Sequence, residues 1–599
     1  MKGKNRGKNI SSDKAKNAKK AFKELLNYSK KYKGRFIIVI LFSILSTLFT
    51  ITAPLYLGKA TTSLYTSFTT NNNIDYKYIG AIIIFLLAIY ILSSIFTYLQ
   101  SFIMAGVSKN IIHNLRKDMS EKINKLPLKY YDNKEKGDIL SKVTNDIEVI
   151  GDTISNGIVE IVTAVVSILS VVIIMFYISI SLTIASIVTL ILSFGLVFYI
   201  MSKSQKFYEK RRKHLGELDG HIEEVYSGHN IIKAYNQEEN VINKFKKINN
   251  DMYSSSWKGQ FFSSLMMPIT SFVGNIGYVL ICILGGYLVV IKRINIGDIV
   301  AFIQYINIFN RQAGQSASIF GDIQMMLAAS ERIFEFINEE EEKEKDKLIE
   351  IKDIKGNITF DHVHFGYNKN KVIIKDFNIK IKAGQKIAIV GPTGAGKTTI
   401  VNLLMRFYEL NSGKILIDNI DISNISKSNL RKNIGMVLQD TWLFNGTIKE
   451  NLLYGKVDAT DEEILIATKA ACANDFIETL PNDYDFILDE ETSNISEGQK
   501  QLLTIARAML ANPKILILDE ATSSVDTRTE VLIQEGMKNL MKDKTSFIIA
   551  HRLSTIRDAD LILVMDSGNI VETGNHKELL NKKGYYYNLY NSQFEAEEN

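Results

Sequence analysis

Cysteine is almost absent from this sequence: its 599 residues include only Cys282 and Cys472, far apart along the chain. Two isolated thiols cannot form a disulfide framework or a cysteine-rich zinc site, so neither kind of fold is predicted. Both residues are interpreted as packing residues. The sequence also lacks an internal repeat, and its only low-complexity tract is the lysine-rich stretch at the N-terminus.

A cleavable signal peptide is not predicted either. The N-terminal stretch is basic, but the apolar run that follows it, residues 36–58, is too long for the hydrophobic region of a signal peptide. This run also has no obvious small-residue cleavage site. We therefore interpret it as a retained membrane span.

The composition, 46% hydrophobic and 23% charged, lies between that of a soluble enzyme and that of a pure membrane protein. The formal net charge of +6 hides an asymmetry, because residues 1–35 contain 13 Lys or Arg and two acids, a local net charge of +11. Beside a membrane, such a segment is expected in the cytosol near anionic lipid. A disordered tail that binds nucleic acid is the alternative, but nothing later in the chain supports it, and no nucleic-acid partner is predicted.

Charge-free windows of about 20 residues are long enough to cross a bilayer. Four windows qualify, and the third, at 42 residues, can hold two helices with a turn near residues 176–182: 36–58, 78–108, 161–202 and 259–291. A weaker sixth span follows and contains Arg311. Six spans place both termini on one side, which the basic N-terminus makes cytosolic. We predict a multi-pass protein of the cytoplasmic membrane.

The polar segments 109–160 and 203–258 have helical patterns and are predicted to continue the spans into the cytosol. The run "EEEEKEKDK" at 339–347 is interpreted as a solvated linker. After it, short β-rich runs alternate with helical segments, which is typical of an α/β nucleotide-binding domain. The predicted fold is thus a membrane α-helical domain of six helices with long cytosolic extensions, plus an α/β P-loop domain. The predicted domains are a basic N-terminal segment at 1–35, a transmembrane domain at 36–338, a linker at 339–350 and a nucleotide-binding domain at 351–599.

The stretch "KIAIVGPTGAGKTT" (386–399) is a strand followed by the pattern G-x-x-x-x-G-K-T, the phosphate loop. Its glycines let backbone N–H groups turn toward phosphates, Lys397 neutralises the β and γ groups, and Thr398 offers a hydroxyl to Mg²⁺. ATP and Mg²⁺ are the predicted cofactors. The predicted nucleotide-binding residues of this loop are Gly391, Pro392, Thr393, Gly394, Ala395, Gly396, Lys397, Thr398 and Thr399.

The stretch "KILILDEATSSVD" (514–526) is an apolar strand that ends in two acids. Asp519 is expected to hold the magnesium shell, and Glu520 to polarise the attacking water. Two exposed acids at the end of a strand are the alternative interpretation of this pattern. The other motifs argue against that alternative.

Those motifs are Gln439, the stretch "NISEGQKQ" (494–501), Asp526 and His551. In this order they resemble the ATP-binding cassette family. The resemblance implies that Gln439 senses magnesium and the membrane domain, and that His551 senses the γ-phosphate and steadies the water. It places the γ-phosphate of a partner's ATP against a signature made of Ser496, Glu497, Gly498 and Gln499. It also matches Tyr367 to the aromatic residue that stacks on adenine.

The membrane half resembles the exporter branch of this family. Residues 126–150 and 227–245 are similar to the regions that carry two coupling helices, and residues 328–337 are similar to the end of the sixth span. Residues 16–33 then form an amphipathic elbow helix on the membrane surface. By this likeness one chain is half of a transporter, and the resemblance implies ATP-driven export by alternating access.

The identity of the second half is open. The signature departs from the common L-S-G-G-Q form at Ile495 and Glu497, and the upstream stretch "LDEETSN" (488–494) lacks the usual glycines. Glu497 is tolerated in many relatives, but the missing upstream glycines resemble the subunit that carries the catalytic glutamate in bacterial heterodimeric multidrug exporters. A heterodimer is therefore favoured, and a homodimer is the alternative because this chain has every hydrolytic residue.

The expected substrate is a hydrophobic or amphipathic small molecule, with a lipid flippase, an importer on the same scaffold and a membrane-tethered ATPase that transports nothing as alternatives. Arg311, Gln304 and Asn307 give the sixth span a polar stripe that could line a cavity. Alternatively, Arg311 pairs with another helix and serves packing or gating.

Overall fold

In the computed structural model the chain forms two compact units. The helical unit comprises residues 1–124 and 135–340, and the cassette unit comprises residues 125–134 and 341–599. The structure describes residues 17–70, 73–132, 134, 136–342, 344–345, 348–351, 353–368, 371–438, 441–489, 494–519, 526–549 and 556–594.

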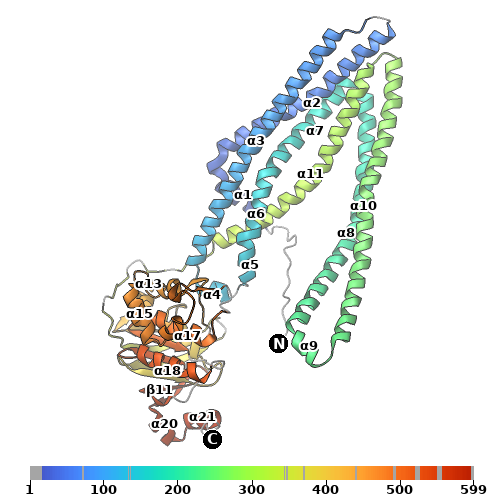
Figure 1. The fold of residues 1–599 in the computed structure, drawn as a ribbon. Helices are drawn as coiled ribbons and strands as arrows, with labels where there is room; N and C mark the ends of the chain where they lie inside the picture. Colours follow the sequence, from blue (N-terminus) through green and yellow to red (C-terminus); the bar gives the residue numbers. More distant parts are fainter. Residues whose placement is uncertain are drawn as a thin grey trace. The chain divides into compact units, whose positions relative to one another are not determined.

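The helical unit consists of long helices, as its apolar runs predict (Figure 1). The helices α8 and α10 run side by side over much of their length, while α2, α7 and α11 pack together. Their bounds, with one short 3₁₀ helix and two π-helical turns, are α1 Ala18–Ser29, η1 Lys30–Tyr32, α2 Lys33–Thr69, α3 Tyr76–Lys125, α5 Lys136–Ser141, η2 Lys142–Asp146, α6 Ile147–Asp152, η3 Thr153–Gly157, α7 Ile158–Ile178, α8 Ile180–Ser227, α9 His229–Ala234, α10 Glu238–Val290 and α11 Ile296–Ile337.

The predicted turn between the third and fourth spans falls at Ser179. This residue is extended, with φ −162° and ψ 118°, and separates α7 from α8. Its hydroxyl accepts a hydrogen bond from the backbone N–H of Leu182 at 3.4 Å, so it also caps α8. The 42-residue window is therefore two helices.

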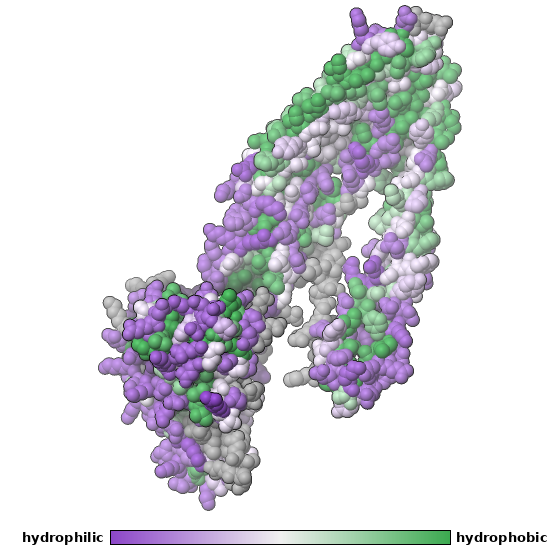
Figure 2. Space-filling model, viewed as in Figure 1, coloured by the Kyte–Doolittle hydropathy of each residue, from purple (hydrophilic) through white to green (hydrophobic). Residues whose placement is uncertain are grey.

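Apolar side chains cover much of the surface of the helical unit, as Figure 2 shows for one face. On α3, for example, Ile84 is 72% exposed and Leu87 is 59% exposed. Between α2 and α3, small polar groups pair instead: Ser43 donates to Gln100 at 2.7 Å. Apolar exteriors with small polar contacts between helices are typical of membrane bundles.

Five stretches of the described helical unit are long and apolar enough to span a membrane, namely Ala18–Thr69, Tyr76–Lys125, Lys136–Ile178, Ile180–Ser227 and Glu238–Val290. The sixth predicted span is the 42-residue helix α11. It is capped by a reciprocal pair in which Asn295 and Asp298 each bond the other's backbone. The weaker signal for this span agrees with its arginine.

The cassette unit is built on a sheet whose ten strands have the order β5-β4-β1-β2-β12-β11-β3-β10-β9-β6. The bounds of its strands are β1 Ile358–Phe365, β2 Ile374–Ile381, β3 Lys386–Val390, β4 Ser412–Ile417, β5 Ile420–Asp421, β6 Ile434–Val437, β9 Ile515–Asp519, β10 Thr545–Ile549, β11 Leu561–Asp566 and β12 Asn569–Gly574, with a separate pair β7 Gly446–Thr447 and β8 Ile487–Leu488. The bounds of its helices are α4 Leu128–Asp132, α12 Lys397–Leu404, η4 Ile422–Asn424, α13 Lys427–Lys432, α14 Ile448–Leu453, α15 Asp461–Ala470, α16 Asn474–Ile477, η5 Asp483–Asp485, α17 Glu497–Ala511, α18 Thr527–Leu540, α20 His576–Lys582 and α21 Tyr585–Phe594.

The strands β11, β3, β10, β9 and β6 pair with one another in parallel, and β3, β9, β10 and β11 are largely buried on both faces. In β3, Ala388 and Val390 belong to one core, and Ile387 and Ile389 belong to the other. Alternate residues of a strand point to opposite faces, so a continuous apolar run feeds two cores. The carboxyl ends of these parallel strands share one edge, which is where α/β sheets bind ligands.

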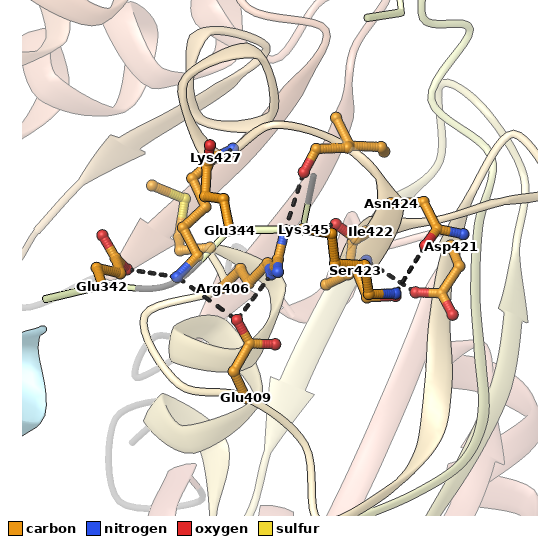
Figure 3. A network of polar contacts seen from close by, with 12 residues as sticks. Glu342, Glu344, Lys345, Arg406, Glu409, Asp421, Ile422, Ser423, Asn424 and Lys427 are labelled. Carbon is orange, nitrogen blue, oxygen red and sulfur yellow. Dashed lines mark hydrogen bonds and ion pairs between the residues drawn. The ribbon is translucent and has the colours of Figure 1, made fainter. Parts of the chain in front are cut away.

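Most of the described linker residues are exposed, as predicted for a solvated segment, but Glu342 is partly buried. Within the cassette unit, Glu342 is only 25% exposed and pairs with Lys427 at 2.9 Å and Arg431 at 3.0 Å. Lys345 donates to Asn424 at 2.7 Å, and Figure 3 shows this contact together with the pair of Glu342 and Lys427. Burial raises the pKa of Glu342, but the hydrogen bonds from the two cations outweigh burial and hold the pKa below its usual range. The cations it needs lie more than 80 residues away, which is why the sequence pattern did not reveal the contact.

Candidate functional site: the nucleotide-binding cassette

The loop between β3 and α12 has a backbone that only glycine adopts easily. Gly391, Gly394 and Gly396 have φ values of +153°, +85° and +103°. A Cβ on Gly391 would lie 2.2 Å from the carbonyl oxygen of Met565, and one on Gly396 would lie 2.8 Å from Cδ1 of Ile374. These close approaches, together with the positive φ values, explain the spacing of the glycines.

The same loop presents the N-terminus of α12 to solvent. No side chain caps the helix at Gly396, and Thr393, Gly394 and Thr398 are exposed. The loop itself is held by two backbone hydrogen bonds, from Ala395 to Pro392 at 3.1 Å and from Gly568 to Ala395 at 3.2 Å. A fixed loop that leads into an uncapped helix start is suited to phosphate oxygens. The residues of this loop therefore fit the phosphates of a nucleoside triphosphate.

The ammonium group of Lys397 lies over the loop. It donates to the carbonyl oxygens of Gly391 at 2.6 Å and Pro392 at 3.2 Å. Burial lowers its pKa, and the nearby charge of Asp519 opposes that change. Among the described residues, this half-buried cation donates to carbonyl oxygens, and it can exchange these bonds for charge-assisted bonds to phosphate.

Asp519 ends β9, which is separated from β3 by one strand, β10. Its electrostatic effect on Lys397 shows that it lies near the phosphate loop. Among the described residues no three His, Cys, Asp or Glu side chains form a metal-binding cluster. The donors available here are the hydroxyl of Thr398 and the carboxylate of Asp519. This set fits Mg²⁺ that takes its remaining ligands from phosphate and water.

Tyr367 lies beside the phosphate-binding helix. Its hydroxyl is 3.4 Å from Oγ1 of Thr399, and Asn402 donates to it at 3.4 Å. Its ring makes edge-on contacts with Phe365 and Tyr408, at centroid distances of 5.0 and 4.9 Å. These contacts fix the plane of a partly buried ring next to the loop, as stacking on a base requires.

The signature motif forms the start of α17. Ser496 and Gln499 cap the helix reciprocally: the N–H of Gln499 donates to Oγ of Ser496 at 3.2 Å, and the N–H of Ser496 donates to Oε1 of Gln499 at 2.8 Å. Ile495, 7% exposed, anchors the motif in the core. The hydroxyl of Ser496 still has a proton to donate.

Glu497 is the first residue of α17 and is paired within the helix. The ammonium group of Lys500 lies 2.7 Å from its carboxylate. A carboxylate here interacts favourably with the helix dipole, but it repels a phosphate. The ion pair offsets that repulsion.

Asp526 caps α18 by accepting hydrogen bonds from the N–H groups of Thr529 at 3.0 Å and Arg528 at 3.1 Å. The bond from Thr529 holds the pKa of this carboxyl below its usual range. Three predicted site residues, Gln439, Glu520 and His551, lie outside the described residues.

One contact of the cassette was not predicted. The short helix α4, which follows the second span in sequence, belongs to the cassette unit, where the hydroxyl of Tyr408 donates to the carboxylate of Asp132. Tyr408 also packs against Tyr367. Tyr408 therefore links Asp132 of α4 to Tyr367, the residue beside the phosphate loop. No local sequence signal marks Tyr408.

The residues predicted to contact substrate lie on α11, where Gln304, Asn307 and Arg311 follow a helical spacing along one face. Asn307 and Arg311 are exposed. Within the described helical unit, Arg311 makes no ion pair. The face is thus polar and accessible in the single chain.

A helical membrane domain and a P-loop ATPase domain in one polypeptide define the class of membrane transport ATPases. The chain matches the models for the ABC transporter transmembrane region at residues 36–312 and for the ABC transporter ATPase domain at residues 374–523. It is 43% identical over 516 residues to the fatty acid ABC transporter ATP-binding/permease protein of Mycobacterium bovis, covering 86% of this chain and 82% of that protein.

A second relative, the "Uncharacterized ABC transporter ATP-binding protein YfiC" of Bacillus subtilis, is 40% identical over 97% of this chain and 96% of its own length. A solved bacterial Atm1-family ABC exporter with ATP bound superposes with a TM-score of 0.73 and 27% identity, covering 94% and 98% of the two chains. The chain therefore belongs to the ABC transporter family.

Membership confirms the predicted fold and several predicted properties. The chain is a multi-pass membrane protein with an exporter-type fold, binds nucleotide, and couples ATP hydrolysis to transport. Its single membrane domain and single cassette make it a half-transporter that acts as a dimer in a lipid bilayer.

Proposed function

We propose that this protein exports hydrophobic or amphipathic small molecules across the cytoplasmic membrane by alternating access, with both termini and the cassette in the cytosol. The observation that carries this proposal is the contact between Tyr408 and Asp132, because it ties the α4 segment to the cassette beside Tyr367. Closure of two cassettes around ATP can then move α4 and the helices that flank it in sequence. Alternating access follows when hydrolysis releases the closed state.

The proposed division of labour in the ATP site follows the chemistry of each side chain. Lys397 and the loop N–H groups hold the phosphates, Thr398, Asp519 and Gln439 hold Mg²⁺, and Tyr367 stacks on adenine. Glu520 polarises the attacking water, and His551 steadies it. Asp526 is included in the proposed site as the cap of α18.

The substrate class is proposed from two sources. The mycobacterial relative is a fatty acid transporter by name, and the exposed polar face of α11 offers Arg311 to the charged end of an amphipath. A long-chain anion satisfies both. A lipid flippase is the second candidate, since the same chemistry fits a phospholipid.

The second half of the dimer is proposed to be a different chain. The self-capped signature with Glu497 departs from the glycine-rich form, and a partner with a degenerate ATP site would match it. A homodimer is the alternative, because this chain carries Lys397, Asp519, Glu520 and His551.

The first test is Mg²⁺-dependent ATP turnover of the purified chain in lipid, compared with Glu520→Gln. Robust turnover that the substitution abolishes, while ATP binding persists, supports Glu520 as the catalytic base and a homodimer. Negligible turnover from folded, ATP-binding protein supports a heterodimer, and the measurement is then repeated after adding candidate second subunits. Full activity in Glu520→Gln would contradict the assigned base.

Transport is tested separately with the purified transporter in sealed proteoliposomes. ATP-dependent movement of a labelled fatty acid into vesicles whose cassettes face outward supports export. Movement in the opposite direction would support an importer. ATP turnover with no flux of fatty acid, phospholipid or hydrophobic dye would leave a membrane-tethered ATPase.

A further inference from the structure

The helical unit contains an apolar groove that the proposed transport cycle does not use. It has a volume of about 490 Å³ and lies among α1, the start of α2, the turn η3, α7 and α11. The residues that define its walls are Phe22, Leu26, Ile37, Ile158, Ile161 and Ile323. Phe22, Leu26 and Ile37 are about half exposed, so the groove opens to the surroundings of the helices.

Part of the groove is lined by a π-helical turn, which is a rare backbone conformation. Ile154 and Gly157 belong to the π-helical turn Thr153–Gly157, and both line the groove. A π turn interrupts the regular spacing of side chains along a helix, and such turns occur frequently at functional sites. The groove is therefore a feature of this helix backbone and not a gap between uniform helices.

The charged side chains that line the groove are all cations. Lys30 and Lys33 line the groove, and among its described lining residues they are the only charged groups. They belong to a run of four cations, completed by Lys31 and Arg35, that immediately precedes the apolar part of α2. Basic clusters directly beside a membrane span attract anionic lipid.

The volume of the groove matches the volume of one acyl chain. A methylene group occupies roughly the volume of a water molecule, about 30 Å³, so a chain of about 16 carbons needs about 480 Å³. The groove thus has space for one acyl chain. A carboxylate at the end of that chain would meet the lysines.

From these observations we infer that the groove is a binding site for a single-chain fatty acid anion, with the acyl chain along the η3 turn and the carboxylate beside Lys30 and Lys33. The occupant enters from the surrounding bilayer, because the exposed side chains of the groove face outward from the helices. The inference concerns binding alone and goes beyond the proposed transport function.

The experiment uses full-length protein in nanodiscs of zwitterionic lipid, without nucleotide, and palmitate that carries a diazirine at its methyl end. Illumination should label peptides from 22–40 and 153–161. Palmityl alcohol with the same diazirine has the same chain without the charge, and it should bind about tenfold more weakly.

Two matched pairs of variants test the geometry. Lys30→Gln with Lys33→Gln should weaken palmitate binding about tenfold, whereas Lys31→Gln, in the same run but outside the groove, should change it by less than about twofold. Ile161→Trp fills the groove and should abolish labelling. Ile173→Trp, on the same helix at a position 68% exposed, should leave labelling intact.

Several results would overturn the inference. They are equal binding of the acid and the alcohol, unchanged affinity after replacing Lys30 and Lys33, or labelling outside the groove. If phosphatidylglycerol displaced the labelled palmitate and unlabelled palmitate did not, the occupant would be a phospholipid. If only dissociated monomers were labelled, a second chain would cover the groove in the dimer. Because binding is read without nucleotide, a failure of the ATP-turnover test leaves this result unaffected.

Discussion

The cassette unit starts two helices at its nucleotide motifs, and the two starts differ. The helix α12 follows a glycine at φ +103° and has no side-chain cap. The helix α17 follows Ser496, whose hydroxyl and partner Gln499 already satisfy two backbone N–H groups. Free N–H groups are available to a ligand, whereas capped ones must first lose their partners. We therefore expect α12 to supply most of the affinity for nucleotide.

The charges at the two helix starts also favour phosphate binding at α12 over α17. Lys397 adds a cation at α12, while Glu497 adds a carboxylate at α17 that Lys500 neutralises. The signature helix thus presents a rigid, nearly neutral surface with one hydroxyl proton. Such a surface suits recognition of a phosphate that another loop already holds.

The largest effect that would sharpen this comparison is expected from Lys397→Ala. Loss of a charge-assisted contact costs about 1.5–3 kcal/mol, or roughly 10- to 100-fold in ATP affinity. Titration with a fluorescent ATP analogue measures it. Lys382→Ala, at an exposed position between β2 and β3, is the control with the same charge change. Equal affinity of the Lys397→Ala variant and the unmodified chain would contradict the difference between the two helix starts.

The second test concerns the loop backbone. Gly391→Ala places a Cβ 2.2 Å from the carbonyl oxygen of Met565, whereas a Cβ on Gly394 meets nothing within 4 Å. Both residues have positive φ, so each variant bears about 1–2 kcal/mol of strain, and only Gly391→Ala adds a backbone clash. The unfolding temperature and ATP affinity should fall further in Gly391→Ala. The reverse order would show that the loop is not held against Met565 in solution.

The third test isolates the neutralised carboxylate of α17. Lys500→Gln should lower ATP turnover of the assembled transporter by about threefold to tenfold, because Glu497 is then an unpaired negative charge near a phosphate. Glu497→Gln alone should change turnover by less than about threefold. The double variant should regain most of the loss. A double variant as weak as Lys500→Gln would mean that Lys500 acts through packing and not through charge.

The phosphate loop and the spans were predictable because their signals are local. Glycine spacing fixes the loop between β3 and α12, and uninterrupted apolar runs fix the helices, including the break at Ser179. The capping pair of Ser496 and Gln499 is also local, since a serine three residues before a glutamine is a known helix-start pattern. The motif was nevertheless interpreted only as a ligand contact.

The contacts that were not predicted join distant parts of the chain. Tyr408 and Asp132 are 276 residues apart, and Glu342 meets Lys427 and Arg431 across the cassette unit. A run of acids gives no sign of cations that are distant in the sequence, so the linker was correctly predicted to be mostly solvated but the pairing of Glu342 was not predicted. Tertiary pairing of charges has no periodicity, and only the folded unit reveals it.

The smallest expected effect concerns a third helix start, that of α18, and it is a dependence on pH. Hydrogen bonds from Thr529 and Arg528 lower the pKa of Asp526 in the folded state below the ordinary value of 3.8. Its stabilising contribution is therefore complete above pH 3.8 and is lost as the pH falls through the folded-state pKa. Asp526→Asn keeps a capping oxygen but cannot titrate. The test is thermal unfolding of the full chain between pH 7 and pH 3, measured at intervals of about one pH unit. As the pH falls, the unfolding temperature should decrease slightly less in Asp526→Asn than in the unmodified chain. Asp458→Asn is the control. A larger loss in Asp526→Asn would mean that the ionised cap is not what stabilises α18 at neutral pH.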